Sequence, residues 1–343
     1  MNPVVWLWTG FLALVLIVLA LDLGVLNRKA HVVETKEALI FTLGVICLAL
    51  AFAVFVYFGY EQHWMGLGLT PDRLDGHINT GRHAAVKFVT GYLIEISLSA
   101  DNVFVIALIF AHLRVPAEFQ HRVLFWGILG ALVMRGAMIG IGAQLVARYH
   151  WILYGFGLFL VITAVRMMMH RDDEEEVPQE AWVLRAMRKW LPISNHYNGS
   201  HFTAIEAGRR VLTPLAVALV LVESTDLVFA VDSIPAIFAI TADPFLVFTS
   251  NVFAILGLRS LYFALAGAIR KFRYLKQSLA AILGLVGVKM LLADLLKEWL
   301  GPDFNFVLLA LVMLILLAGI AASAVAERRE ARRSATPAAG PGD

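Results

Sequence analysis

The sequence contains little charge and almost no cysteine. Only 16% of its 343 residues are Asp, Glu, Lys or Arg, whereas a soluble domain carries about 25%. The single cysteine, Cys47, lies in an apolar run, which excludes a disulfide framework and a cysteine-based metal site. The sequence also has no phosphate-binding loop, dinucleotide motif, zinc-protease motif or nucleophile elbow. We therefore expect no enzyme activity and no prosthetic group. It has no basic face interleaved with aromatic residues, so we expect no nucleic-acid partner.

Long apolar runs take the place of charge: 60% of the residues are hydrophobic, and the mean hydropathy is +0.77. A bilayer needs about 20 mostly apolar residues per helix, which predicts an all-α membrane protein embedded in the lipid bilayer. We predict about nine transmembrane helices, at residues 4–26, 38–60, 86–112, 121–143, 151–170, 211–240, 245–269, 278–296 and 304–326. Residues 171–210 form the longest loop, in which Trp182 to Trp190 is typical of a basic amphipathic helix on a membrane surface. The tail, residues 327–343, lacks apolar residues and is predicted to be disordered.

The Lys and Arg residues are distributed unevenly between alternate loops. If the N-terminus is outside, 19 of the 28 lie in inside segments and 5 in outside segments, and the remaining 4 lie within spans. Because positive charge accumulates on the cytoplasmic side, this bias predicts the orientation of a multi-pass membrane protein. Its N-terminus is expected outside, and its C-terminus and the 171–210 loop in the cytoplasm. No Lys or Arg precedes the first span, so we expect that it is not a cleaved signal peptide.

The charges within the spans recur in two sets, because the segment SADNVF (99–104) matches STDLVF (224–229). Each set has the order acid, base, base: Asp101, Arg135 and Arg166 in one half, and Asp226, Arg259 and Lys289 in the other. The topology makes the matching spans antiparallel. We therefore predict an inverted repeat of three helices, residues 86–170 and 211–296, outside which lie the first two spans (within 1–60) and the last (304–326). Transporters built this way bind substrate near the bilayer midplane, between the halves.

Acids at bilayer depth are costly and are functional by default. Glu223 and Asp226 share a helix face at i and i+3. In contrast, Asp226 and Asp232 lie about 240° apart on a regular helix and would converge only if the helix unwinds, for which Pro235 offers a reason. Glu95 and Asp101 have the same six-residue spacing and the same requirement. We also expect Asp101 and Asp226 to meet at mid-bilayer.

Carboxylate, amide and hydroxyl oxygens without deep His or Cys favour a hard divalent cation such as Mn²⁺, Mg²⁺ or Ca²⁺. The predicted ion site consists of Glu95, Asp101, Asn102, Glu223, Asp226 and Asp232. Its charge would be balanced, when it is empty, by Arg135, Arg259, Arg166 and Lys289. These bases could instead pair with the acids simply to hold the helices together.

Two segments carry a resemblance to a known family. LIEISLSADNVFVIALIF (93–110) and LVESTDLVFAVDSIPAIFAIT (221–241) resemble the signature segments of the TerC family of bacterial membrane proteins. LDLGVLNRKAH (21–31), LPISNHYNG (191–199) and SNVFAILGLRSLYF (250–263) resemble its intervening pattern, so the resemblance covers residues 5 to 325. It implies a location in the bacterial inner (plasma) membrane, a role in metal-ion homeostasis, manganese export as the activity, and kinship with LysE-type exporters. It also implies that the five acids named above are site residues. The departure is Asn195 to Asn198, where the family more often reads Asp-Tyr-His.

The function that we expect is export of divalent cations, with Mn²⁺ as the first choice. Because no ATPase motif is present, an ion gradient would drive it. The alternative is a membrane-embedded partner or assembly protein whose buried charges form structural ion pairs and which transports nothing. A hydrolase with Asp101 and Asp226 as a catalytic dyad would leave the other buried charges unexplained. The sequence leaves open the metal, the coupling ion, and whether the chain forms a homo-oligomer or binds other membrane proteins.

Overall fold

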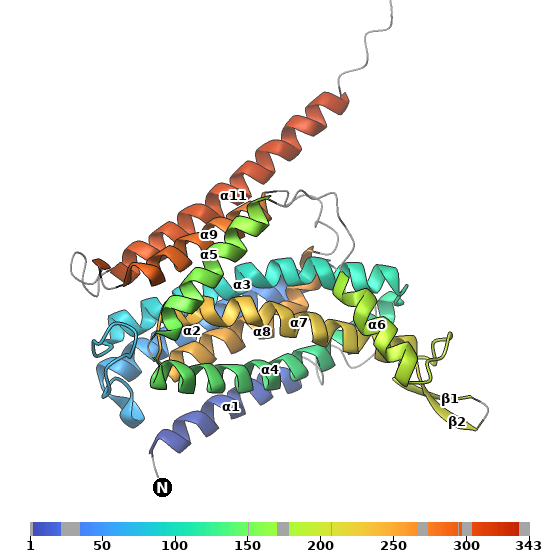
Figure 1. Ribbon diagram of the computed structural model, residues 1–343, viewed down its shortest axis with the longest axis horizontal. Coiled ribbons are helices and arrows are strands. Elements are labelled where there is room, and N and C mark those ends of the chain that lie inside the picture. Colours follow the sequence, from blue (N-terminus) through green and yellow to red (C-terminus); the bar gives the residue numbers. More distant parts are fainter. Residues whose placement is uncertain are drawn as a thin grey trace, which may run out of the picture.

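The computed structural model describes residues 3–21, 35–149, 151–169, 178–206, 208–265, 274–293, 295–296 and 304–335. Helices make up most of this part of the chain (Figure 1). They are α1 (Pro3–Leu21), α2 (Thr35–Glu61), α3 (Gly81–His112), α4 (Ala117–Arg148), α5 (Ile152–Met169), α6 (Pro178–Trp190), α7 (Pro214–Phe238), α8 (Pro244–Leu265), α9 (Leu275–Leu291) and α11 (Phe304–Ala335). A short 3-10 helix, η2 (Trp64–Gly66), and one hairpin, β1 (Thr203–Glu206) with β2 (Arg209–Leu212), complete the described structure.

The prediction of an all-α membrane protein is confirmed. Eight of the described helices are long and apolar enough to cross a bilayer, and each coincides with a predicted span. The predicted span at 278–296 corresponds to α9, which has 17 residues and so lies at the short limit for a transmembrane helix. Residues 22–26 and 266–269, at the ends of two predicted spans, lie outside the described residues.

The structure adds a hairpin that the sequence reading did not predict. Thr203 pairs with Leu212 and Glu206 with Arg209 in antiparallel register, and Gly208 takes a positive φ of 78° at the turn. Because β2 extends to Leu212, the sixth span begins at Pro214 and not at residue 211. The predicted amphipathic segment is helical, as α6. At the other end, α11 continues to Ala335, so the tail predicted to be disordered from residue 327 is helical up to that point, and residues 336–343 lie outside the described structure.

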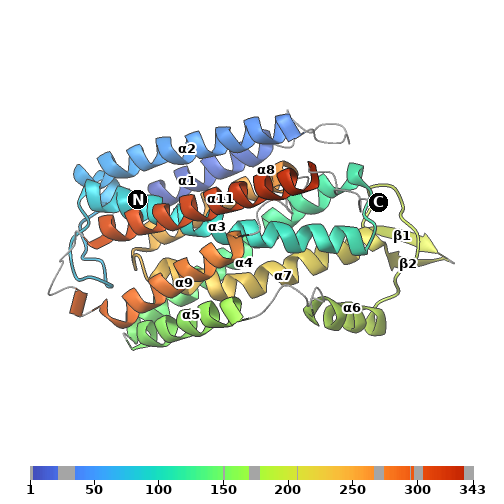
Figure 2. The same cartoon turned by 90° about the horizontal axis from the view of Figure 1, so that it is seen from above.

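The transmembrane helices lie side by side, and Figure 2 shows the two ends of the bundle. One end, which we call the hairpin end, carries β1, β2 and α6. There Tyr197 Oη donates to the carbonyl of Leu113 at 2.8 Å, next to the α3–α4 turn. The opposite end, the loop end, carries the α2–α3 segment (residues 62–80), which hydrogen-bonds to the α7–α8 turn through Ala242. α3 therefore runs toward the hairpin end and α7 away from it, so the two helices are antiparallel.

Helix contacts cross between the two proposed repeats. α3 packs on α8, α4 packs on α7, and α5 packs on α9. The approach of α5 to α9 depends on glycine, because a Cβ at Gly287 would lie 2.9 Å from the carbonyl oxygen of Gly157. Small residues permit such close backbone contact between membrane helices. This reciprocal pattern is what two inverted three-helix units would produce, although the repeat itself stays a prediction.

Candidate functional site

A buried arginine on α4 lies at the centre of the bundle. Arg135 is 2% exposed, and Asp226 on α7 accepts from its Nε at 3.1 Å and from its Nη2 at 2.9 Å. The remaining nitrogen, Nη1, forms an ion pair with Glu95 on α3 and donates to Ser233 and Asn251 at 3.2 Å each. The guanidinium thus joins α3, α4, α7 and α8. The prediction that Arg135 lies beside an acid is confirmed.

The local geometry follows from regular helices. Asp226 and Ser233 are seven residues apart on α7, which is close to two full turns, so both face α4. The side-on contact of Asp226 uses two parallel N–H donors, the strong bidentate form of this ion pair. Glu95 is 1% exposed and Asp226 8%, so both carboxylates are withdrawn from water. Removing the arginine would leave them as uncompensated buried charges.

A third acid, Glu223, lies one helical turn before Asp226 on the same face of α7 and is near enough to interact with it electrostatically. Its carboxylate lies directly against Gly130 of α4, in space that a Cβ at that position would occupy. Arg135 is the one base paired with Glu95, Asp226 or Glu223 among the described residues. With all three ionised, the cluster has a net charge of about −2, since it contains three carboxylates and one guanidinium.

A small pocket adjoins this cluster. Its polar lining comes from Asn102, Thr225 and Asp226, and apolar side chains such as Ile106 and Leu124 form the rest. About 10 Å³ is open to the centre of a water-sized sphere, which is close to the space that one water occupies. Asn102 is 4% exposed, and its Oδ1 has no hydrogen-bond partner among the described residues. The pocket is thus lined both by Asn102, whose amide oxygen is unsatisfied, and by Asp226.

The other predicted residues lie elsewhere. Asp101 is half-buried on α3, six residues or about 9 Å beyond Glu95, and its charged neighbour is Lys276 at the start of α9. The acid from α3 that reaches the Asp226 cluster is therefore Glu95. Asp232 faces α5, where Thr163 hydrogen-bonds to it and Arg166 lies within electrostatic reach.

The structure also shows where the other two predicted bases, Lys289 and Arg259, lie. Lys289 on α9 donates to the carbonyl of Ala239 at the C-terminal end of α7, where a cation complements the helix dipole. Arg259 is buried on α8, 3% exposed. That Arg259 lies beside an acid stays a prediction.

The unwinding that would bring Asp232 to Asp226 does not occur. α7 is continuous from Pro214 to Phe238 with Pro235 inside it, and α3 is continuous from Gly81 to His112. On uninterrupted helices a six-residue separation places two side chains about 240° apart. Each pair of acids therefore serves two different helix interfaces, and convergence of either pair is excluded in this conformation.

Sequence reasoning missed three members of the site: Ser233, Asn251 and Gly130. The polar pair Ser250-Asn251 within a mostly apolar span was a usable signal for α8. Nothing in the sequence singled out Gly130 among the chain's 26 glycines. Among the described residues, no three His, Cys, Asp or Glu side chains are grouped closely enough to hold a metal ion. In this conformation the guanidinium of Arg135 lies between Glu95 and Asp226.

Comparison with known proteins gives relatives along nearly the whole chain. The integral membrane protein TerC family matches residues 80–331. A Myxococcus xanthus membrane protein, STKORF319, is 48% identical over 94% of this chain and 93% of its own length. An Escherichia coli K12 protein, whose name proposes a membrane-bound redox modulator, Alx, is 42% identical over 91% and 93%. A Rickettsia bellii membrane protein is 35% identical over 93% and 97%. No solved structure matches. The chain is a multi-pass membrane protein that belongs to the TerC family.

Proposed function

We propose that this protein is a secondary transporter that exports divalent metal cations, with Mn²⁺ as its substrate, through the cluster of Glu95, Asp226 and Glu223. The observation that carries the proposal is the excess of acid over base: Glu95 and Asp226 share one guanidinium inside the bundle, and Glu223 adds a third carboxylate that is paired with no base among the described residues. Ion pairs that serve only to hold helices together would balance, because an unpaired buried charge is strongly destabilising. A cluster with a net charge of about −2 is matched by one divalent cation.

The donor atoms support a hard cation. Carboxylate oxygens of Glu95 and Asp226, the amide oxygens of Asn102 and Asn251, and the hydroxyl of Ser233 are all oxygen ligands. Mn²⁺, Mg²⁺ and Ca²⁺ take oxygen ligands, whereas softer metals take thiolate or imidazole. We propose no enzymatic reaction and no resident cofactor, since the cation is the cargo.

Arg135 has a defined part in this mechanism. With no cation bound, its guanidinium neutralises Glu95 and Asp226. A cation entering from the pocket beside Asn102 would compete for the same carboxylates and displace the guanidinium. When the cation leaves, Arg135 or incoming protons restore neutrality, which would allow exchange of metal for protons. We propose that the hairpin end is cytoplasmic, as the charge bias predicts, so the pocket would be the entry side.

The assembly-protein alternative is weaker on the same ground. A protein that transports nothing requires its buried charges to pair, and Arg135 does bind Asp226 in a fully buried bidentate pair. Glu223, however, is paired with no base among the described residues. Redox modulation, which the name of the Escherichia coli relative proposes, would have to operate without an intramolecular disulfide, because this chain has one cysteine.

Manganese tolerance of cells that lack their own exporters tests the proposal. Expression of this protein should raise tolerance, and Glu95→Gln, Asp226→Asn and Glu223→Gln should each abolish the gain at matched membrane expression. Asp101→Asn is also expected to abolish it if the second acid of α3 belongs to the path. Glu175→Gln, in the acidic run at 172–176, is the matched control and should change nothing. Tolerance equal to that of the wild type with Asp226→Asn and Glu95→Gln would leave the acids structural, and no gain in tolerance from the wild-type protein would favour the assembly protein.

A further inference from the structure

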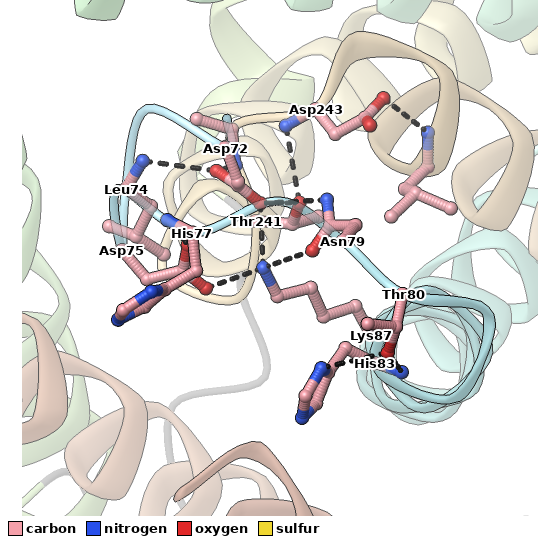
Figure 3. Close-up of polar contacts among 12 residues, drawn as sticks. Asp72, Leu74, Asp75, His77, Asn79, Thr80, His83, Lys87, Thr241 and Asp243 are labelled. Atoms are coloured by element: carbon pink, nitrogen blue, oxygen red, sulfur yellow. Dashed lines mark hydrogen bonds and ion pairs between the residues drawn. The ribbon is translucent and has the colours of Figure 1, made fainter. Parts of the chain in front are cut away.

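The α2–α3 segment is tied to the loop end of the bundle by one buried carboxylate (Figure 3). Asp72 is 3% exposed. Its Oδ1 accepts from the backbone amides of Leu74 at 3.0 Å and Ala242 at 2.9 Å. Its Oδ2 accepts from Lys87 Nζ at 2.8 Å and from the hydroxyl of Thr241. One side chain thus connects the segment to α3 and to the α7–α8 turn.

Lys87, near the start of α3, is the positive centre of this network. Its ammonium donates to Asp72, to Asp75 at 2.6 Å and to Asn79 at 2.7 Å. An ammonium has three N–H donors, so all three are satisfied although the residue is only 1% exposed. Burial of a charge is tolerated only with such partners. The position of the segment over the bundle therefore depends on Lys87.

A second contact at this end joins α2 to the start of α8. Tyr60, in the last turn of α2, donates to Asp243 Oδ2 at 2.7 Å. The other oxygen of Asp243 accepts from the amide of Phe245 at 3.0 Å and so caps the start of α8. Together with Asp72 and Lys87, this contact joins α2, α3, α7 and α8 at the loop end.

The interior is closely packed on the loop side of Arg135, whereas the small pocket lies on the hairpin side. A Cβ at Gly91 would overlap Ile237, and one at Gly142 would lie 2.7 Å from the Phe238 ring, so no space separates these helices toward the loop end. The α4 residues that line the pocket, such as Leu124, all precede Arg135, and apart from Asp226 itself most of its α7 residues, such as Val222, precede that aspartate. Since α4 and α7 both begin at the hairpin end, the pocket lies on that side of the acids.

We propose that the α2–α3 segment is the gate of the ion path at the loop end, held shut in this conformation by Asp72 and Lys87. The inference rests on the proposed transport function, because a gate requires a path. Lys87 lies eight residues, about 12 Å, before Glu95 on α3, and Thr241 follows the helix that carries Asp226. Release of Asp72 from Thr241 and Ala242 frees the loop-end termini of both helices that carry the site's acids. The cation leaves toward the loop end in that open form.

Accessibility of a cysteine behind the gate tests the inference without requiring transport. In a Cys47→Ala background, Ile237→Cys places a thiol on α7 where the native side chain is 2% exposed. A membrane-impermeant maleimide is then applied to each side of the membrane separately. Lys87→Met should increase the labelling rate from the loop end at least about ten-fold, because it leaves two carboxylates without their partner. Asp72→Asn should give a smaller increase, since an amide still accepts from Leu74 and Ala242. Arg73→Gln, exposed in the same segment and outside the network, is the control and should give no increase.

The outcomes separate the gate from the transport function. Increased labelling with Lys87→Met and Asp72→Asn, together with loss of export by Asp226→Asn, supports the gate; increased labelling while Asp226→Asn still exports shows that the segment opens but overturns the proposed path through Asp226. Unchanged labelling in folded Lys87→Met protein overturns the gate, even if Asp226→Asn abolishes export. If both variants fail to fold while Arg73→Gln folds, the network serves folding alone and the gate is likewise overturned.

Discussion

Replacing Gly130 by Ala should displace the carboxylate of Glu223 without a change of charge. The added Cβ would overlap both oxygens and the Cδ of Glu223. A comfortable contact needs about 3.5–4.0 Å, so the carboxylate would retreat by roughly 1 Å or more. Because the atoms that must move are the end of a flexible side chain, the helices can stay in place. Metal ligands are held to within about 0.2 Å of their ideal distance, so we expect Gly130→Ala to lower Mn²⁺ export about as much as Glu223→Gln does.

Gly140→Ala is the matched control on the same helix. A Cβ at Gly140 meets nothing within 4 Å, and alanine favours a helix by about 1 kcal/mol over glycine, so this variant should fold and export normally. The assay is initial-rate Mn²⁺ uptake into inverted vesicles at matched protein content. In the Glu223→Gln background, Gly130→Ala should cause little further loss, because both changes act on one ligand. Wild-type export by Gly130→Ala would refute the placement of Glu223 in the ion path.

Two further predictions follow from the buried charges. Arg135→Met should destabilise the protein by about 3–5 kcal/mol, the cost of breaking a buried ion pair, as measured by denaturant titration in detergent. Combining Arg135→Met with Asp226→Asn should recover part of this loss of stability. If the losses of the two single variants simply added in the double variant, that would argue against the ion pair. Burial raises the pKa of the Asp72 carboxyl, but the Lys87 ammonium and hydrogen bonds from Lys87, Thr241 and Leu74 outweigh burial and hold the pKa below its ordinary value. An acid with a lowered pKa stabilises the fold above the ordinary value of about 3.9 and loses that contribution as the pH falls through the lower, folded value. Burial, together with the charge of Asp72, raises the pKa of Asp243, so a proton taken up by Asp243 relieves repulsion on Asp72. Among the described residues, the other charged or titratable groups that interact with Asp72 are Lys87 and Tyr60. Asp75 binds the same ammonium of Lys87. Hydrogen-exchange protection of the Leu74 and Ala242 amides, corrected for intrinsic rates, should therefore not decrease from pH 8 to pH 5, and a loss across that range would contradict the ion pair.

The spans could be predicted because bilayer thickness fixes helix length and lipid excludes charge. The same logic identified Arg135, Glu95 and Asp226, since a charge at that depth needs a partner. What the sequence could not provide is which acid meets which base. Helical spacing shows that Asp226 and Asp232 cannot share a face, but only the packing of α3 on α8 and of α4 on α7 places Glu95 at Arg135 and leaves Asp101 near Lys276.

The loop-end network was also outside the reach of sequence reasoning. Lys87 lies at the edge of the predicted span 86–112, where a charge is ordinary. Its partners are 8 to 15 residues away in a segment without regular structure, and Thr241 is 169 residues from Asp72. Contacts set by how a loop folds back on a bundle leave no periodic signal in the sequence.

Metal flux through the purified protein in liposomes tests the central claim most directly. With an outward-directed proton gradient and Mn²⁺ outside, wild-type protein oriented with its hairpin end outward should load Mn²⁺, and Asp226→Asn should reduce loading to that of empty liposomes while remaining folded. Mn²⁺ flux by Asp226→Asn equal to that of the wild type, or no flux by the wild type under any ion gradient, would contradict the account.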